Sequence, residues 1–482
     1  MGKEAMNTRF FTVPGSDRKY DRNIILAVLL ISLMMSLLQV SSVNNLLPSI
    51  HSALATSDSA TQWILSGFTL AIGVMLVPAG RMGDLAGRSG MFVLGLGVFV
   101  LASLGCGLAT APIVLNIMRV FQGFGAGIYS PQVTGMILQY FQGKARAKAF
   151  GLMGLVVSMS VAVGPVLSGS MVSWFGPDPG WRVSFFLNVP IALIGMLASW
   201  RYLPFLHQKT RHHLDVDPFG MVLLVFAVLC IMIPFMSTAS WRWFLLIGGA
   251  VLLIAWVIWE QKYELRGKEP MVSINLFRTR SFGYCTAISG LQFLGSSSLF
   301  VVLAMFLQQG LGVSALWVGL IGLPNAIASG YMAVWSGRHA LDHGKSIQIF
   351  ALSTMFATTL IVIFVAWGMT HHDWPIWLMS IALIPIGIGA GSMGAANQTQ
   401  GMLDVPPSHG GAAGGVLQTV QRVSTAIGNA MITGVFFAAN ATGEDPAHWF
   451  QGFASSLMVV AVFVGSAALV AAQYWRVSRS RG

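Results

Sequence analysis

The sequence predicts an all-α membrane protein whose chain crosses the bilayer fourteen times. Hydrophobic residues make up 55% of the 482 residues and charged residues only 9%, a composition that a soluble chain of this length could not solvate. The apolar residues lie in runs of about 18–25, the length that an α-helix needs to cross a hydrocarbon core of about 30 Å. These runs are too long and too continuously apolar for the alternating strands of a membrane β-barrel.

The predicted spans follow one another in chain order, with helix-ending residues such as Pro48 and the Pro406–Pro407 pair between them. Their expected ranges are 23–47, 61–80, 90–110, 113–138, 149–174, 183–204, 218–237, 242–260, 282–308, 315–336, 346–369, 375–398, 411–438 and 452–475.

The basic residues of the loops predict the orientation. Roughly 23 Lys and Arg fall in the two tails and in one set of alternating loops, against 2 (Arg182 and Arg242) in the opposite set, so the positive-inside rule predicts that both termini are cytoplasmic. The net charge of +11 therefore indicates membrane orientation rather than a nucleic-acid partner. We expect a multi-pass protein of the plasma (inner) membrane.

The longest polar cytoplasmic segments, 207–217 and 260–280, bracket the seventh and eighth spans. This layout divides the chain into six, two and six spans, an arrangement in which transporters place their site between the halves near the midplane. The predicted parts are an N-terminal tail (1–22), a six-helix bundle (23–205), a linker with a two-helix insert (206–260), a cytoplasmic linker (261–281), a second six-helix bundle (282–475) and a C-terminal tail (476–482).

Three segments carry glycine-rich motifs: Gly80–Arg88, Leu115–Gly127 and Gly164–Gly169. They resemble, in that order, the cytoplasmic signature loop, the fourth-span motif and the exporter-type fifth-span motif of the major facilitator superfamily. Segments 181–190, 275–278 and 311–324 resemble the fourteen-span drug:proton antiporter branch. The resemblance covers nearly the whole chain. It implies two six-helix bundles plus two extra central spans, and secondary transport by alternating access.

The first span departs from that branch, which usually carries Leu-Asp-x-Thr-x-x-Asn followed by Pro. Here Gln39 stands in place of the acid, while Asn44 and Pro48 match. A buried carboxylate is the usual proton carrier, because ionisable groups in a bilayer are costly and are kept for function. No Asp or Glu is expected inside any of the long apolar stretches. An amide cannot titrate, so we expect Gln39 to be a neutral contact and proton coupling through the first span to be absent.

The candidate cavity residues are polar or charged side chains inside predicted spans: Gln39, Asn44, Arg119, Gln122, Gln292, Asn325 and Asn397. A cation such as Arg119 costs about 2.5–3.5 kcal/mol or more in a span, so it needs a compensating role. It is either a charge near the cavity, with Gln122 one turn away, or a structural residue that ties helices together through backbone carbonyls. For Arg422 the structural alternative is preferred, because the residue is expected near a cytoplasmic helix end.

Asp84 lies on the glycine-rich signature turn beside Arg88, with Gly80 and Gly87 around it. An acid there can cap a helix N-terminus of the opposite half and pair with the arginines. We call this arrangement the latch; the alternative is a solvated loop that only sets topology. The packing glycines Gly123, Gly127, Gly164 and Gly169 are expected to permit close helix approach. Pro165 is expected to bend the fifth span, where the resemblance implies a cavity seal.

No metal-ligand spacing, nucleophile with its base, or nucleotide motif stands out in the sequence. We therefore expect a protein that is not an enzyme, has no cofactor and acts as a monomer in the bilayer. The predicted function is export of amphipathic or apolar small molecules, as in multidrug efflux. The alternatives are an anionic or lipid-like substrate steered by Arg119, or a membrane sensor that does not transport; the intact signature turn argues against the sensor.

Overall fold

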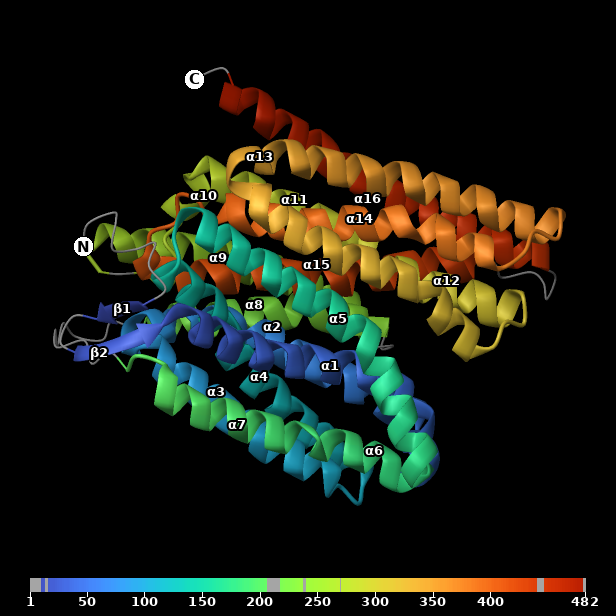
Figure 1. The fold of residues 1–482 in the computed structure, drawn as a ribbon, viewed down its shortest axis with the longest axis horizontal. Helices are drawn as coiled ribbons and strands as arrows, with labels where there is room; N and C mark the ends of the chain where they lie inside the picture. The colour runs from blue at the N-terminus through green and yellow to red at the C-terminus, as the bar shows by residue number, and fades with distance from the viewer. Residues whose placement is uncertain are drawn as a thin grey trace. The chain divides into compact units, whose positions relative to one another are not determined.

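The computed structural model describes residues 10–13, 16–205, 217–236, 240–268, 270–439 and 446–479. These residues are almost entirely helical (Figure 1). The α-helices are α1 (Arg22–Leu54), α2 (Asp58–Ala86), α3 (Arg88–Gly107), α4 (Pro112–Tyr140), α5 (Gly143–Phe175), α6 (Pro177–Phe186), α7 (Asn188–Tyr202), α8 (Pro218–Met236), α9 (Phe244–Leu265), α10 (Asn275–Arg278), α11 (Arg280–Ser296), α12 (Leu299–Met305), α13 (Ala315–His371), α14 (Trp377–Gly401), α15 (Gly410–Ala439) and α16 (Pro446–Arg479).

Within the described part of the chain, 11 helical segments are long and apolar enough to cross a membrane. These segments support the predicted all-helical membrane protein. Two further long helices, α4 and α15, do not reach the same apolarity, because both are rich in glycine and carry polar side chains such as Arg119 and Arg422. The predicted linker 207–217 lies outside the described residues except for Asp217.

Helix α13 contains two predicted spans and the turn predicted between them at 337–345, which is helical in the structure. The helix nevertheless folds back on itself. The backbone at Gly387 of α14 meets Asn325, and the backbone at Gly389 meets Met355. In a straight helix Asn325 and Met355 would lie about 45 Å apart, so two positions only two residues apart on α14 could not contact both.

The contacts between residues divide the chain into two units. The first contains residues 1–149, 163–278 and 405–419, and the second contains 150–162, 279–404 and 420–482. Helices α5 and α15 are therefore each shared between the units, a division that the order of the spans does not predict. Glycine lets each of these helices approach a neighbour in its unit closely: Gly151 of α5 meets Gly337 of α13, and Gly415 of α15 meets Leu76 of α2.

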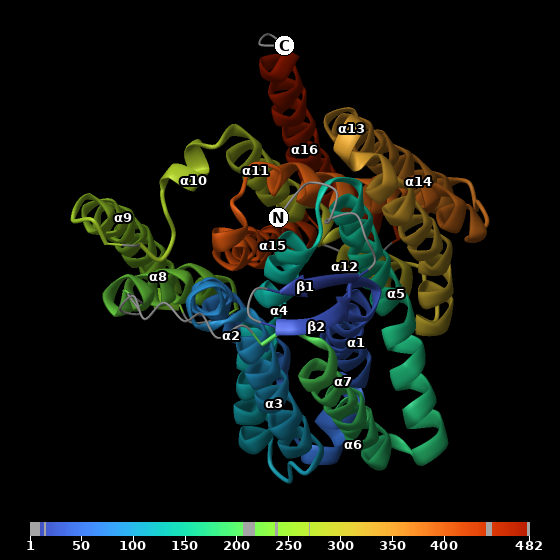
Figure 2. The ribbon, with the colours of Figure 1, turned by 60° about the vertical axis from the view of Figure 1, so that its left-hand side comes forward.

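Each unit has an apolar core. In the first, α4 packs along α2 and α3, and a cluster of buried side chains including Ile64, Leu115 and Trp181 joins α1, α2, α4 and α6. Helices α8 and α9 pack side by side (Figure 2). In the second unit, α13, α14 and α16 surround a core in which the Phe306 and Phe453 rings stack with centroids 4.6 Å apart.

The N-terminal segment contains an element that the sequence analysis did not predict. Strands β1 (Phe10–Val13) and β2 (Ser16–Asp21) form an antiparallel hairpin. Its Phe11 ring lies 5.2 Å from the Tyr140 ring at the end of α4, and Phe11, Val13 and Tyr20 are buried. A segment expected only as a polar tail is thus anchored to the first unit by aromatic contacts.

Candidate functional site

The signature turn reverses the chain between α2 and α3 at a single residue. Gly87 separates Ala86 from Arg88 and has a φ of 105°, in a region that side chains with a β-carbon rarely adopt. Gly80, two turns earlier, approaches α15 directly: a β-carbon there would lie 2.7 Å from the carbonyl carbon of Gly411. Glycine at both positions lets the end of α2 reach the first turn of α15.

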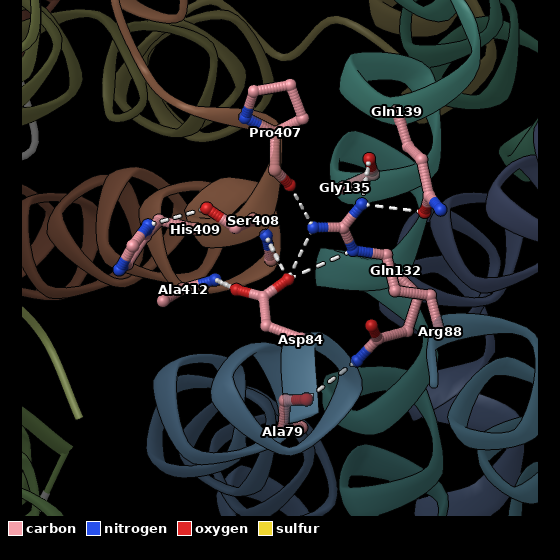
Figure 3. A network of polar contacts seen from close by, with 11 residues as sticks. Ala79, Asp84, Arg88, Gln132, Gly135, Gln139, Pro407, Ser408, His409 and Ala412 are labelled. Atoms are coloured by element: carbon pink, nitrogen blue, oxygen red, sulfur yellow. Dashed lines mark hydrogen bonds and ion pairs between the residues drawn. The ribbon is translucent and has the colours of Figure 1, made fainter. Parts of the chain in front are cut away.

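The Asp84 carboxylate binds the first turn of α15. Its Oδ1 accepts a hydrogen bond from the Gly411 amide at 3.0 Å and its Oδ2 one from the Ala412 amide at 2.9 Å (Figure 3). Helix α15 begins at Gly410, so these amides belong to its first turn, where the N–H groups have no partner inside the helix. The Asp84 side chain is only 1% exposed, and its negative charge lies at the positive end of the helix dipole.

The Arg88 guanidinium pairs with the Asp84 carboxylate and donates hydrogen bonds to three other acceptors. Its Nε and Nη2 donate to Asp84 Oδ1 at 3.0 and 2.6 Å. Its Nη1 donates to the Gly135 carbonyl and to Gln139 Oε1, both at 2.8 Å, and its Nη2 also donates to the Pro407 carbonyl (Figure 3). One guanidinium therefore joins the end of α2, the end of α4 and the segment before α15.

The structure brings together Gly80, Asp84, Gly87 and Arg88, as well as residues that were not site candidates in the sequence analysis. Gln139 and Pro407 accept hydrogen bonds from Arg88, and Gln132 Nε2 donates to the Ala79 carbonyl at 2.7 Å. The glycine-rich start of the thirteenth predicted span was the available signal, because a run of small residues at a helix N-terminus permits close approach of another backbone.

Arg119 is 1% exposed, and its contacts lie within the first unit. Its Nε donates to the Ile64 carbonyl at 2.9 Å, its Nη1 donates to Gln122 Oε1 at 2.7 Å, and its guanidinium lies 4.1 Å from the centre of the Phe68 ring. Gln122 Nε2 in turn donates to Ser103 Oγ at 2.8 Å. None of these partners is a carboxylate, so the structural alternative describes the observed contacts of Arg119 better than a free cavity charge.

Gln39 is 2% exposed, and its Oε1 accepts a hydrogen bond from Asn188 Nδ2. The Gln39 Nε2 has no hydrogen-bond partner among the described residues. The Gln39 Oε1 atom therefore links α1 to the start of α7, while the Nε2 group remains available as a donor. The side chain of the nearby candidate Asn44 lies outside the described residues.

The glycines of the fourth and fifth spans lie at close helix crossings in the first unit. A β-carbon on Gly164 would lie 3.2 Å from the Leu38 carbonyl oxygen, and Ser42 Oγ donates to the Gly164 carbonyl at 2.9 Å. A β-carbon on Gly127 would lie 2.8 Å from Met75 Cβ. Pro165 is exposed inside α5 and Gly169 is half-buried.

Gly123 allows the closest of these approaches between α4 and α2. A β-carbon on it would lie 2.5 Å from the Phe68 carbonyl oxygen and 2.7 Å from Ala71 Cβ. We therefore expect Gly123→Ala to lower the stability of the purified protein by about 1–3 kcal/mol, as overpacking does. Gly97→Ala on α3, where nothing lies within 4 Å, is the matched control and should be neutral. Thermal unfolding in detergent compares the two, and equal midpoints would contradict the packing role.

The remaining candidates lie in the second unit. Asn397 Oδ1 accepts from Gln348 Nε2 at 2.9 Å, and its Nδ2 donates to the Cys285 carbonyl at 3.0 Å, so it ties α14 to α13 and α11. Gln292 is 7% exposed on α11. Asn325 Oδ1 is buried without a hydrogen-bond partner in the described part of the chain.

Comparison with known proteins finds the same family whose motifs the sequence resembles. The family model of the Major Facilitator Superfamily matches residues 29–233 and 218–429. The probable actinorhodin transporter of Streptomyces coelicolor is 31% identical over 425 residues, covering 86% of this chain and 72% of that protein. The puromycin resistance protein of Streptomyces alboniger is 29% identical over 474 residues, covering 95% and 91%.

Among solved structures, the human organic anion transporter MFSD10 is similar with a TM-score of 0.66 at 13% identity, covering 93% of this chain and 99% of that one. At this identity the similarity shows the fold alone. The family model and these relatives together define a multi-pass membrane transporter. The chain belongs to the Major Facilitator Superfamily, and its relatives named for drug resistance place it in the drug-efflux branch.

Proposed function

We propose that this protein exports amphipathic or apolar small molecules across the plasma membrane by alternating access. The observation that carries the proposal is the latch, in which the buried Asp84 carboxylate binds the first turn of α15 and Arg88. A charge-and-dipole contact of this kind stabilises the arrangement in which it forms and must break in the other. A membrane sensor would not need such a contact to form and break in a cycle.

The fourteen predicted spans are part of the proposal. The 57 residues of α13 would extend about 85 Å as a straight helix, more than twice the bilayer core, and its fold-back supplies two spans instead of one. With α4 (29 residues) and α15 (30 residues) added to the 11 apolar segments, the proposed number of spans is the one that the sequence predicts. An even number agrees with two basic, cytoplasmic termini in a monomer.

The substrate class is proposed from the charges of the cavity candidates. Arg119 is held by Ile64 and Gln122, so little remains of it to steer an anion, and the other candidates are neutral amides. Met, Phe and Trp are plentiful, with 26, 30 and 15 residues, and such side chains can form pliable apolar surfaces that accept varied molecules. The relatives named for drug resistance support the same class.

Transport by the purified protein in proteoliposomes tests the proposal. With a non-titrating amphipathic cation or neutral dye, we expect saturable flux in the native protein, and an imposed pH gradient at clamped membrane potential should change its rate less than about twofold because an amide at position 39 cannot titrate. Gln39→Asp should introduce a dependence on the gradient. Gln62→Asp, outside the candidate set, is a control for adding an acid.

Two results would count against the proposal. Absence of flux for every amphipathic substrate, with flux of organic anions instead, would favour the anionic alternative. Strong uphill transport driven by the pH gradient in the native protein would contradict the absence of proton coupling and would mean that a group other than Gln39 carries the proton.

A further inference from the structure

Two acidic side chains are buried together in the central helix pair, outside the latch. Asp217 directly precedes α8 and is 1% exposed, while Glu260 lies inside α9 and is 0% exposed. The expectation that the long apolar stretches contain no acid is therefore wrong at Glu260. The predicted span ended at this residue, whereas the apolar segment of the structure runs from Trp241 to Leu265.

Asp217 is fixed by its own helix and by α9. Its Oδ1 accepts from the Gly220 amide at 3.0 Å, so it caps the N-terminus of α8. The Trp259 indole N–H donates to its two carboxylate oxygens at 2.9 and 3.1 Å. Asp217 has a φ of 42°, a conformation that a side chain with a β-carbon adopts only when its surroundings hold it there.

Glu260 has weaker partners than Asp217. The amides of Met271 and Val272 and the Trp256 indole face it, but neither carboxylate oxygen has a hydrogen bond among the described residues, and the Trp256 N–H is unpaired as well. A buried carboxylate in this state is costly, because ionised groups removed from water need a counter-charge or hydrogen bonds.

The two carboxyl groups meet beside Gly220. A β-carbon on Gly220 would lie 3.0 Å from Glu260 Oε1 and closer still to Asp217 Oδ2. The two oxygens therefore lie within about 6 Å of each other, the range in which like charges disfavour simultaneous ionisation. Two ionised carboxylates at this separation repel each other unless one of them is neutralised.

Among the described residues, the basic side chains nearby form no ion pair with the two carboxyl groups. On α9 and the segment after it, Arg266 lies 5.9 Å from the Trp259 ring centre, Lys268 lies 5.1 Å from that of Tyr263, and Lys262 is exposed. Glu264 Oε1 accepts from Ser273 and Asn275.

The described helices around the pair form no ion pair with it, although α2, which packs on α8, carries the buried Arg81. In the described part of α8, residues 218–236 carry no charged side chain. Helix α2 packs on α8 through Gly73 and Met232, far along α8 from Asp217. No ion pair to Asp217 or Glu260 is formed by the described residues.

We propose that Asp217 and Glu260 together bind one proton, which makes the α8–α9 pair a proton-binding site. The protonated Glu260 carboxyl donates its O–H to Asp217 Oδ2, as two adjacent carboxyl groups share a proton when both cannot ionise. One proton removes the repulsion and gives one unpaired Glu260 oxygen a partner. Loss of that proton leaves two negative charges in a dry site, so alkaline pH should loosen the contact between α8 and α9.

Infrared spectroscopy of the full-length protein in nanodiscs at neutral pH tests this site. A carbonyl-stretching band of a protonated carboxyl that shifts in heavy water should be present in the native protein and in Glu264→Gln, the control one turn along the same helix. The band should be lost in Glu260→Gln and lost or shifted in Asp217→Asn. A native protein without the band, or a band that persists unchanged in both variants of the pair, would overturn the proposal.

Thermal unfolding supplies a second readout that does not depend on transport. From mildly acidic to alkaline buffer, the unfolding midpoint of the native protein should fall, because the folded state holds a proton that the unfolded state releases. Glu260→Gln, which carries a neutral side chain at every pH, should remove that fall, whereas Glu264→Gln should keep it. An equal fall in Glu260→Gln and in the native protein would contradict a shared proton.

Discussion

Asp84→Asn is expected to reduce the initial transport rate at least about tenfold while leaving the protein inserted in the membrane. Asparagine keeps one oxygen, which can accept from Gly411 or Ala412, but it loses the charge that binds Arg88 and the α15 dipole. Charge-assisted hydrogen bonds contribute about 1.5–3 kcal/mol each, and about 1.4 kcal/mol corresponds to a factor of ten. In the proposed cycle, loss of the latch should shift the balance between the two states by at least that factor.

Initial rates normalised to membrane level measure this effect. Asp342→Asn is the matched control, because Asp342 is an acid in segment 337–345, between two predicted spans, and this segment is helical within α13. It should transport at close to the native rate. Native rates in Asp84→Asn at native expression would remove Asp84 from the mechanism.

Arg119→Ala is expected to destabilise the protein by about 3 kcal/mol, the cost of breaking a buried polar network and leaving a cavity. The Ile64 carbonyl and Gln122 Oε1 would lose their donor, and the space against Phe68 would be empty. Arg119→Lys should also destabilise the protein, because an ammonium cannot reproduce the fork of the guanidinium.

Thermal unfolding and transport per folded molecule separate a structural role from a cavity role. Arg422→Gln is the contrast: Arg422 is half-buried near the middle of α15 rather than at its cytoplasmic end, and no hydrogen bond or ion pair joins it to the described residues. We expect it to leave the unfolding midpoint unchanged. If Arg119→Ala keeps native stability but loses substrate binding, the structural role is wrong.

Much of the fold could be predicted because membrane spans have a strong signal. Length and apolarity located the helices, and the Gly-Arg-Met-Gly-Asp pattern of the turn predicted that Asp84 would meet a helix N-terminus, which is where the structure has it. Such a motif is local, and the carboxylate, the tight glycine turn and the arginine all lie within nine residues.

What the sequence could not predict depends on contacts between distant segments. The partner of Gln39 is Asn188, 149 residues away, and nothing in either span indicates that pairing. The burial of Glu260 was missed because a boundary drawn from hydropathy ends a helix at the first charge, whereas α9 continues for another turn. The β1–β2 hairpin was missed because its apolar alternation is only a few residues long.

The central claim is that the start of α15 must separate from α4 and α2 during transport. Ser130 Oγ donates to Gln418 Oε1 at 2.7 Å, so cysteines at these positions should be joined by a short bifunctional thiol reagent. The native Cys106 and Cys285 are buried and Cys230 is half-buried, and the protein without the engineered pair controls for them. Crosslinking the Ser130→Cys/Gln418→Cys variant should abolish transport, and cleavage of the linker should restore it. Transport at the native rate with the crosslink intact would contradict alternating access through this contact.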